Sequence, residues 1–202
     1  MEARQPMSLI TKNAMITRDV DLLSTLAANN LCRVAISINS LDQALTKVME
    51  PACSAPAARL EAIRKLSDAG IPVHVMVAPI IPGLNDHEMP AILKAAADAG
   101  AKSAGYNMIR LPLSVETVFM DWIKRHRPTH AEKIESRLRS VRDGKLNQSE
   151  FGIRMRGSGP IAEQFHALFK LSRQRCGLVA TLPKSRTDFF RPPRHSSGQQ
   201  FL

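Results

Sequence analysis

The sequence predicts an α/β fold built on parallel strands. Four short apolar segments recur in the first part of the chain, and each is followed by a segment with apolar residues at helical spacing. Strand–helix units that repeat about every 30 residues need right-handed crossovers, which make the strands parallel. Val73–Ala78 is almost continuously apolar, as expected of a strand covered on both faces.

The predicted strands and helices alternate along the chain. The strands are Met7–Thr11, Val34–Ile38, Val73–Ala78 and Ala104–Ile109, and the helices are Arg18–Ala28, Pro56–Ala69, Glu88–Ala99 and Val115–Lys124. We expect Thr17 to cap the first helix and Asn85 or Asp86 to cap the third, because short polar side chains accept hydrogen bonds from the free N–H groups there. Pro79 and Gly83 are expected to end the third strand.

Two topologies use this repeating unit, the closed eightfold barrel and the open doubly wound sheet. A complete eightfold barrel needs about 250 residues, and four units are half of one. The first strand would also be an unpaired, apolar edge in a lone chain. We therefore expect the second half of a larger fold, marginally stable or associated when it is alone.

The pattern changes after Trp122. Ala131–Asp143 is predicted to be an exposed basic helix, and Ile161–Arg175 an amphipathic helix that ends at Gly177. From Val179 onward no periodicity survives and Pro, Ser, Arg and Gln dominate, which predicts a flexible tail. The expected organisation is a half barrel over residues 1–127, a helical extension over 128–178 and a mostly disordered basic tail over 179–202.

The positive charge gathers toward the C-terminus. Residues 1–121 hold 11 Lys and Arg against 12 Asp and Glu, whereas residues 122–156 hold 10 against 4 and residues 173–202 hold 6 against 1. A basic flank on a neutral body suits an electrostatic footprint for polyphosphate or nucleic acid, and equally a solvated helix surface with a tail.

The three cysteines do not form a recognisable metal or disulfide pattern. Cys32, Cys53 and Cys176 lie 21 and 123 positions apart, which matches no CxxC spacing and leaves one thiol over in any disulfide scheme. No apolar run approaches the roughly 20 residues of a membrane span, and no signal peptide opens the chain. We expect a cytoplasmic protein with no membrane partner and no metal ligands of its own.

Polar or small residues follow each predicted strand, at the edge where parallel α/β folds bind ligands. These residues are Lys12; Ser37, Asn39 and Ser40; Pro79, Ile81 and Gly83; and Tyr106, Asn107 and Arg110. Lys12 supplies a cation for a carboxylate or phosphate, and Gly83 leaves room for a flat ring against Ile81. Ser37 and Asn39 add short donors and acceptors. The set predicts a pocket for a zwitterionic or anionic ligand with an apolar plane.

Several segments resemble one known family. They are SLITKNAMITRDVDLL, RVAISINSLD followed by MEP, RLEAIRKLSDAGIPVHVMVAPIIPGLND, AGYNMIRLP, GIRMRGSGP, FFRPP and GQQFL. In order and spacing they are similar to radical S-adenosylmethionine (radical SAM) proteins related to spore photoproduct lyase, in the branch described as DNA-repair-photolyase-like. The resemblance implies a partial (β/α) TIM-like barrel, followed here by C-terminal helices and a tail. It also implies an iron–sulfur cluster that reduces the cosubstrate to a 5′-deoxyadenosyl radical.

The resemblance also implies which residues hold S-adenosylmethionine. Lys12 and Ser37 match positions at the methionyl end, and Asn39 lies beside the ribose. Ile81 and Gly83 match the adenine-packing motif GxIxGxxE, in which Pro79 and Asp86 replace the first Gly and the Glu. Tyr106, Asn107 and Met108 lie on the strand that flanks the adenine.

One family element is missing from this sequence. The CxxxCxxC loop that binds the 4Fe–4S cluster precedes the matching segments in the family, and Cys32, Cys53 and Cys176 do not supply its spacing. Three thiolates on one loop are needed for three irons of such a cluster. We therefore expect a fragment that binds part of the cosubstrate site and is inactive without a cluster-binding N-terminal half, from the same gene or from a separate chain.

Two other functions remain open at this level. One is a nucleic-acid-binding module, with Phe151 as its main stacking side chain and with the basic residues Arg137, Arg139, Arg142, Arg154 and Arg156. The other is an aldolase-like barrel half in which Lys12 forms a Schiff base. In either an enzyme or a binding module, Arg110, Arg154 and Arg156 are candidate contacts to an anionic substrate.

Overall fold

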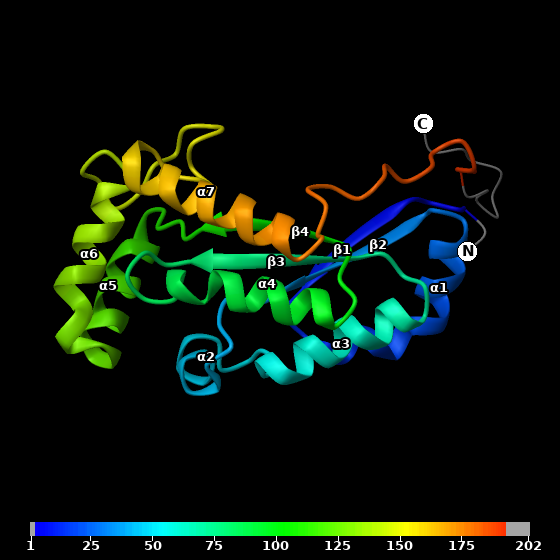
Figure 1. Ribbon diagram of the computed structural model, residues 1–202, viewed down its shortest axis with the longest axis horizontal. Helices are drawn as coiled ribbons and strands as arrows, with labels where there is room; N and C mark the ends of the chain where they lie inside the picture. Colours follow the sequence, from blue (N-terminus) through cyan, green and yellow to red (C-terminus); the bar gives the residue numbers. More distant parts are fainter. Residues whose placement is uncertain (1–2, 193–202) are drawn as a thin grey trace, which may run out of the picture.

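A computed structural model describes residues 3–192 and has one parallel four-stranded sheet in the order β1-β2-β3-β4 (Figure 1). The strands are β1 (Met7–Thr11), β2 (Cys32–Ser37), β3 (Val73–Ile80) and β4 (Ser103–Met108). Neighbouring strands pair in register, from Met7 beside Cys32 to Val77 beside Tyr106. The predicted parallel α/β fold is confirmed.

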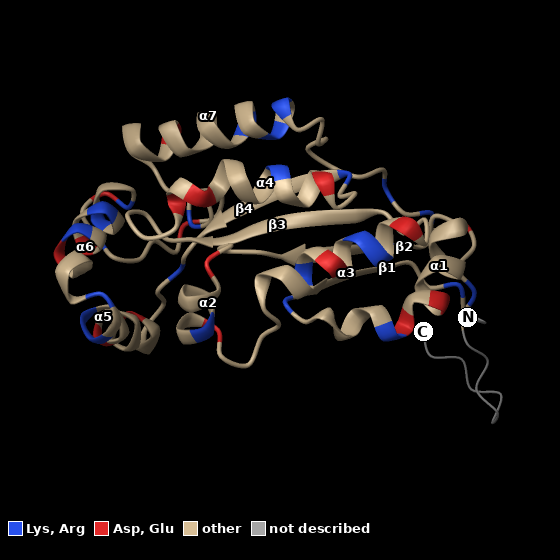
Figure 2. Ribbon diagram, turned by 60° about the horizontal axis from the view of Figure 1, so that its bottom comes forward, with Lys and Arg blue, Asp and Glu red and all other residues tan. Residues whose placement is uncertain are grey.

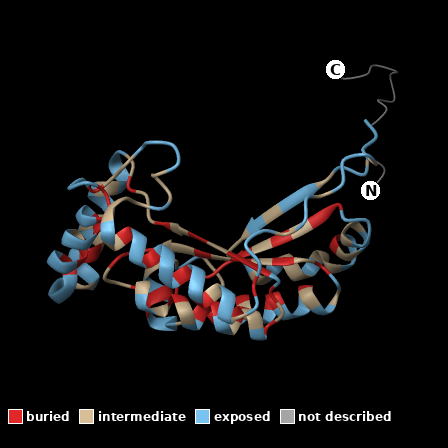
Figure 3. Ribbon diagram, turned by 45° about the horizontal axis from the view of Figure 1, so that its top comes forward, coloured by how far each residue is buried: buried red, intermediate tan, exposed pale blue. Residues whose placement is uncertain are grey.

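The two faces of the sheet differ in burial. On one face, alternate residues such as Val34, Ile36 and Val75 are fully buried beneath helices. On the other face Ser37 and Ser103 are buried, but most residues, including Arg33, Ala35 and His74, are only half-buried or exposed. In Figure 3 the buried residues (red) lie in the strands and on the parts of the helices that face them, and the exposed residues (pale blue) lie on the outer parts of the helices. The strands therefore have one open face, as expected for part of a barrel.

Four helices cover the buried face. They are α1 (Val20–Ala28), α3 (Pro56–Asp68), α4 (Met89–Asp98) and α7 (Gly159–Arg175). Helix α7 packs beside α4, and α4 packs beside α3 (Figure 2). Phe165 and Phe169 of α7 join the same core as the strands, so this late helix completes the covering layer over β4.

The carboxyl ends of the strands lead into a second group of helices, α2 (Gln43–Met49), α5 (Ser114–His126) and α6 (Ala131–Ser140) (Figure 1). A smaller core forms where α5 and α6 meet the loop after β3; its buried residues are Ile81, Leu111, Ile123, Ala131, Ile134, Leu138 and Leu146. Helix α6 is therefore apolar on one side, which corrects the prediction of an exposed basic helix, and it ends at Ser140 rather than Asp143.

Two cap predictions were wrong, and one short helix was not predicted. A 3-10 turn over Ala14–Asp19 precedes α1, and Asn13, whose side chain accepts from the Met15 N–H, caps it in place of Thr17. Helix α2 was not predicted, because it is short and its cap, Asp42, follows a loop rather than an apolar repeat. Asn85 and Asp86 make no cap hydrogen bond and bond instead within the loop after β3.

Pro79 also differs from its prediction, since it lies within β3 and does not end it. The register of β3 with β4 shifts between Val77 and Ile80. Proline has no N–H to give to the ladder, and such an irregularity in the pairing accommodates it.

The C-terminal segment returns toward the amino ends of the strands (Figure 1). Gly177, the second residue after α7, has a φ of +69°, as predicted for a helix stop. Val179 then pairs beside Ser103 on the free edge of β4, and Arg186 N–H donates to the Asn30 carbonyl. Residues 179–192 contain no helix or longer strand; the rest of the predicted tail, 193–202, lies outside the described residues.

His74 gives the open face a titratable group. Its Nδ1 lies 2.7 Å from Ser103 Oγ, and Gly105 leaves room for the ring, because a Cβ there would lie 2.9 Å from its Nε2. Burial, followed by the charge of Arg33, holds the pKa of His74 below its ordinary value of 6.5.

We expect His74 to make stability depend on pH. Because the folded state binds a proton on His74 less readily than the unfolded state does, this contribution is complete above about pH 6.5 and is lost as the pH falls toward the lower folded-state pKa. Urea unfolding from pH 8 to pH 5 checks this. His74→Gln should flatten the decline below pH 6.5, and parallel pH profiles for the two proteins would contradict the assignment.

Candidate functional site

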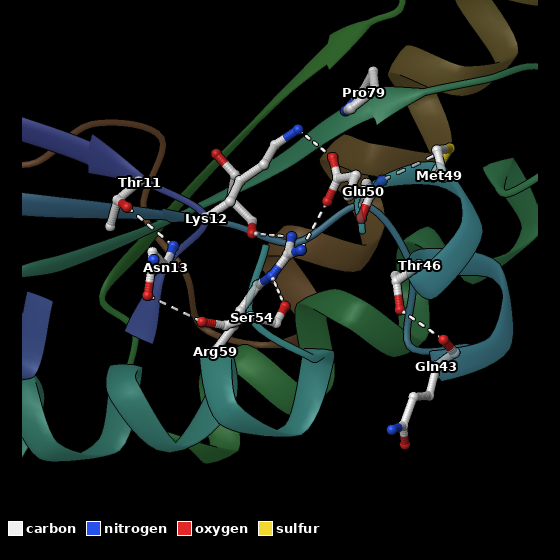
Figure 4. Close-up of polar contacts among 12 residues, drawn as sticks. Thr11, Lys12, Asn13, Gln43, Thr46, Met49, Glu50, Ser54, Arg59 and Pro79 are labelled. Atoms are coloured by element: carbon white, nitrogen blue, oxygen red, sulfur yellow. Dashed lines mark hydrogen bonds and ion pairs between the residues drawn. The ribbon is translucent and has the colours of Figure 1, made fainter. Parts of the chain in front are cut away.

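A buried ion-pair network lies under the carboxyl ends of β1 and β2 (Figure 4). Arg59 of α3 is 1% exposed, and its Nη2 donates to Glu50 Oε2 at 2.7 Å. The other carboxylate oxygen of Glu50 accepts from Lys12 Nζ. Lys12 keeps about a third of its side chain exposed (34%). The network therefore holds one cation at the surface of the strand-end region.

Arg59 also bonds two backbone carbonyls. Its Nη1 donates to the Ser37 carbonyl at 3.0 Å, and its Nε donates to the Ser54 carbonyl at 2.7 Å. Ser54 in turn donates its N–H to the Lys12 carbonyl, and its Oγ accepts from the Ala14 N–H. One side chain thus fixes the end of β2, the loop before α3 and the exit of β1.

The pairing of Lys12 bears on the aldolase-like alternative. A Schiff-base lysine must present a neutral amine. In this structure Lys12 Nζ is instead engaged in an ion pair with the Glu50 carboxylate. This arrangement suits an electrostatic contact better than a nucleophile.

A second network joins the loops after β2 and β3. Asn85 is fully buried; its Nδ2 donates to the Asn39 and Pro79 carbonyls, and its Oδ1 accepts from the Ile81 N–H. Glu88 accepts from Ser40 Oγ at 2.6 Å and from the Leu41 N–H at 2.7 Å. The acidic residue that bridges the two loops is therefore Glu88, whereas Asp86 accepts from the Gly83 N–H within its own loop.

Asn39 carries an unsatisfied polar atom at this edge. The residue is fully buried, and its Oδ1 has no hydrogen-bond partner. A buried acceptor without a partner costs about 1–3 kcal/mol, and a ligand donor would remove that cost. Ser37, 5% exposed, is the last residue of β2, two positions before Asn39. Lys12, Ser37 and Asn39 are thus brought to one edge of the sheet.

The β4 residues divide between the two faces. Asn107 is half-buried on the open face, whereas Tyr106 and Met108 belong to the core on the helix-covered face. Tyr106 packs on Phe169 with ring centroids 4.7 Å apart. Asn107 is therefore the β4 side chain placed on the same face as the open strand residues.

Ile81 and Gly83 lie toward the second core. Ile81 is fully buried there, and a Cβ on Gly83 would meet Arg137 and Ile134 of α6 at 3.6 Å. Gly83 has a φ of +85°, a conformation that favours glycine. The loop after β3 therefore contributes its backbone to the site, while the Ile81 side chain packs in the second core.

The arginines considered as anion contacts differ in burial and in hydrogen-bond partners. Arg110 follows β4, is half-buried and has a buried Nε without a partner. Arg142 is fully buried; burial, followed by the charge of Arg110, lowers its pKa, and its guanidinium donates to the Ile109 and Arg154 carbonyls. Arg154 lies over the ring of exposed Phe151 at 5.3 Å, and Arg156 is exposed. Arg142 is thus structural rather than a surface contact.

The cysteines do not fit an iron–sulfur cluster. Cys32 is buried in β2, and Cys53 and Cys176 are half-buried on separate elements. Within residues 3–192 no group of three or more His, Cys, Asp or Glu side chains is arranged to hold a metal ion. In the same part of the chain, no helix is long and apolar enough to cross a membrane.

Sequence reasoning missed the residues that frame the site. Glu50 and Arg59 were not assigned a role, although Glu50 stands in the MEP segment of the resemblance. Glu88 was taken as the first residue of a helix. A lone Glu or Arg on a predicted helix face is ordinarily a solvated residue, so only the MEP segment offered a signal.

Part of this chain is similar to known proteins. The Radical SAM superfamily model matches residues 2–96, from β1 into α4, which confirms the resemblance to radical SAM proteins over that part. An uncharacterised protein of Mycobacterium tuberculosis, Rv2578c, is 34% identical over 125 residues, which are 61% of this chain and 37% of that protein. An uncharacterised protein of Methanocaldococcus jannaschii, MJ0683, is 31% identical over 88 residues, 44% of this chain and 33% of its own length.

Solved structures of spore photoproduct lyase share the fold. A mutant of that enzyme with bound AdoMet and dinucleoside spore photoproduct superposes with a TM-score of 0.59 at 21% identity, covering 87% of this chain and 51% of that one. A second mutant gives a TM-score of 0.58 with the same coverage. The partial-barrel architecture is thus confirmed. The chain spans about a third of the length of its curated relatives and half of these structures.

The two ion pairs of Glu50 are expected to contribute very differently to the free energy of unfolding. Glu50→Gln removes the partner of fully buried Arg59, and breaking such a pair costs about 3–5 kcal/mol of unfolding free energy. Lys12→Met keeps that pair and removes a partly exposed cation, so its cost should stay within about 1 kcal/mol. Urea unfolding of both variants measures the difference, and equal losses would contradict a central role for Arg59.

Proposed function

We propose that this chain, which carries a Radical SAM superfamily segment, forms the C-terminal half of an S-adenosylmethionine pocket in a radical SAM enzyme. One observation carries the proposal: the matched residues 2–96 contain the rigid strand-end frame around Arg59 and Asn85. Lys12 and Asn39 lie in that frame as a partly exposed cation and an orphaned buried acceptor.

The residues of this frame suit the polar parts of the cosubstrate. Lys12 and Ser37 would hold its amino-acid end, and Asn39 its ribose. The loop containing Ile81 and Gly83 and the β4 segment Tyr106–Met108 would flank the ring, with Asn107 as the side chain on the open face. When bound, S-adenosylmethionine supplies a reducible sulfonium; the chain's own residues bind and orient it.

We also propose that the cluster-binding half lies outside these residues, in the same gene product or in a separate chain. Cys32, Cys53 and Cys176 lie too far apart in sequence and on separate elements. Among the described strands β1 pairs only with β2, and its free side exposes Met7 at 37% and Ile10 at 63%. Another β-strand placed there would cover these side chains and remove an apolar edge. Three free thiols also suit a reducing, cytoplasmic setting.

A nucleic-acid substrate is our proposal for the substrate class. A solved structure of spore photoproduct lyase is complexed with a dinucleoside, and here the exposed ring of Phe151 pairs with the half-buried Arg154, a combination of the kind that stacks on bases. A dedicated basic binding module is less well supported, because Arg142 is buried and Arg139 pairs with Glu135 at 2.8 Å.

The missing cluster loop gives a direct prediction. Anaerobic reconstitution of this chain with iron and sulfide should give no stoichiometric 4Fe–4S absorbance, because Cys32, Cys53 and Cys176 lie on separate elements. Ultraviolet–visible spectra with iron and sulfide counting measure this. A full cluster signal that disappears in Cys32→Ser and Cys53→Ser would overturn the proposed division of labour.

The pocket assignment is tested by cosubstrate binding. In the chain combined with its cluster-binding half, Lys12→Ala and Ser37→Ala should each weaken S-adenosylmethionine binding by about tenfold, since hydrogen bonds to charged groups contribute about 1.5–3 kcal/mol. Lys47→Ala, on nearby α2, is the matched control and should bind as the unmodified protein does. Calorimetry that finds all three variants alike would return Lys12 and Ser37 to a structural role.

A further inference from the structure

A groove on the outer side of β4 lies apart from the strand-end frame. It has a volume of about 560 Å³ and runs between the edge of β4 and one side of α7. The polar side chains along it are Tyr106, Arg156, Ser158, Glu163, His166 and Lys170. This volume is within the range of small-molecule sites, about 300–1,000 Å³.

The groove contains a buried hydroxyl without a partner. Tyr106 is 8% exposed, and its OH has no hydrogen-bond partner. The ring is fixed by Phe169 at 4.7 Å and by His166 at 6.4 Å between centroids, so the hydroxyl lies on the α7 side of β4. A buried hydroxyl without a partner is destabilising, and a hydrogen bond from it to a ligand acceptor would remove that destabilisation.

The charges along the groove favour an anion. Arg156 and Lys170 are exposed, and within residues 3–192 neither has a carboxylate at ion-pair distance. Glu163 is the one acidic side chain lining it. Arg173 lines an adjoining hollow that shares Tyr106 and Lys170 and reaches the open face at Met76 and Gly105.

Helix α7 adds donors at one end of the groove. Its N-cap residue, Ser158, makes no side-chain cap hydrogen bond, and the Ser158 hydroxyl donates to Asp143 Oδ1 at 2.8 Å. Pro160 in the first turn of this 17-residue helix has no N–H, and the other first-turn N–H groups receive no side-chain acceptor from the N-cap residue. Gly157 lets the loop approach β4, since a Cβ there would lie 2.7 Å from the Val141 carbonyl and 3.1 Å from Met108 Sδ.

We propose that this groove binds a phosphate group, with Arg156 and Lys170 as its cations, Tyr106 OH as a neutral donor and the start of α7 as a backbone donor. A phosphate monoester has several acceptor oxygens and more than one negative charge at neutral pH. This matches two cations and two further donors, against the lining carboxylate of Glu163 and the Asp143 carboxylate, which already accepts from Ser158. A free mononucleotide and a nucleic-acid backbone both carry this group.

The inference does not depend on the proposed cosubstrate pocket. Tyr106 belongs to the β4 segment assigned to the cosubstrate pocket, but its hydroxyl lies on the side of β4 opposite the open face. Arg156 and Lys170 belong to the groove alone, so Arg156→Ala and Lys170→Ala should leave cosubstrate binding unchanged. These two variants distinguish failure of one proposal from failure of the other.

Binding of defined phosphate probes tests the site. Calorimetry would compare adenosine 5′-monophosphate with adenosine, and a short single-stranded oligonucleotide without a terminal phosphate would separate a backbone source from a free one. We expect binding of at least one phosphate-bearing probe and none of adenosine. Arg156→Ala and Lys170→Ala should each weaken it about tenfold, whereas Arg175→Ala, on α7 but outside the groove, should not.

Tyr106→Phe separates a binding role from a structural one. It removes the unpaired hydroxyl and keeps the ring on Phe169, so the melting temperature should stay the same or rise while phosphate affinity falls about fivefold to tenfold. The proposal is overturned if no phosphate-bearing probe binds at millimolar concentration. It is also overturned if the Arg156, Lys170 and Tyr106 variants bind like Arg175→Ala.

Discussion

The buried guanidinium of Arg59 is the interaction on which the strand-end region depends. It is 1% exposed, yet it donates to the backbone of two segments and to the carboxylate of Glu50. Removing a charge from water is costly unless every donor finds a partner. Here the partners are the end of β2 and the loop before α3, so satisfying one charge fixes the geometry of the edge where ligands bind in parallel α/β folds.

The amide of Asn85 and the carboxylate of Glu88 extend this constraint to the next strand. Asn85 bonds the loops after β2 and β3, and Glu88 holds Ser40 and the Leu41 N–H. All of these hydrogen bonds are made within the chain itself, and a site held by its own contacts has less to order when a ligand binds. At this frame Lys12 has a partly exposed side chain, and the Oδ1 atom of Asn39 has no hydrogen-bond partner.

Repeating patterns were readable from the sequence, and single long-range contacts were not. The strand β1 was predicted at its observed bounds and Gly177 at its helix stop, because alternation and left-handed glycine are local signals. Helix α2 and the position of Pro79 inside β3 were missed, since tertiary packing and a register shift decide them. The pairing of Glu50 with Arg59 spans separate elements, and no local pattern indicates it.

The assignment of the strand ends to S-adenosylmethionine is tested most directly by mapping where that molecule binds. Amide chemical shifts of the chain combined with its cluster-binding half would be recorded before and after its addition. The account predicts changes concentrated at Lys12, Ser37, Asn39 and the loop around Gly83, with little change along α7. Changes confined to other surfaces, or none at saturating concentration, would contradict it.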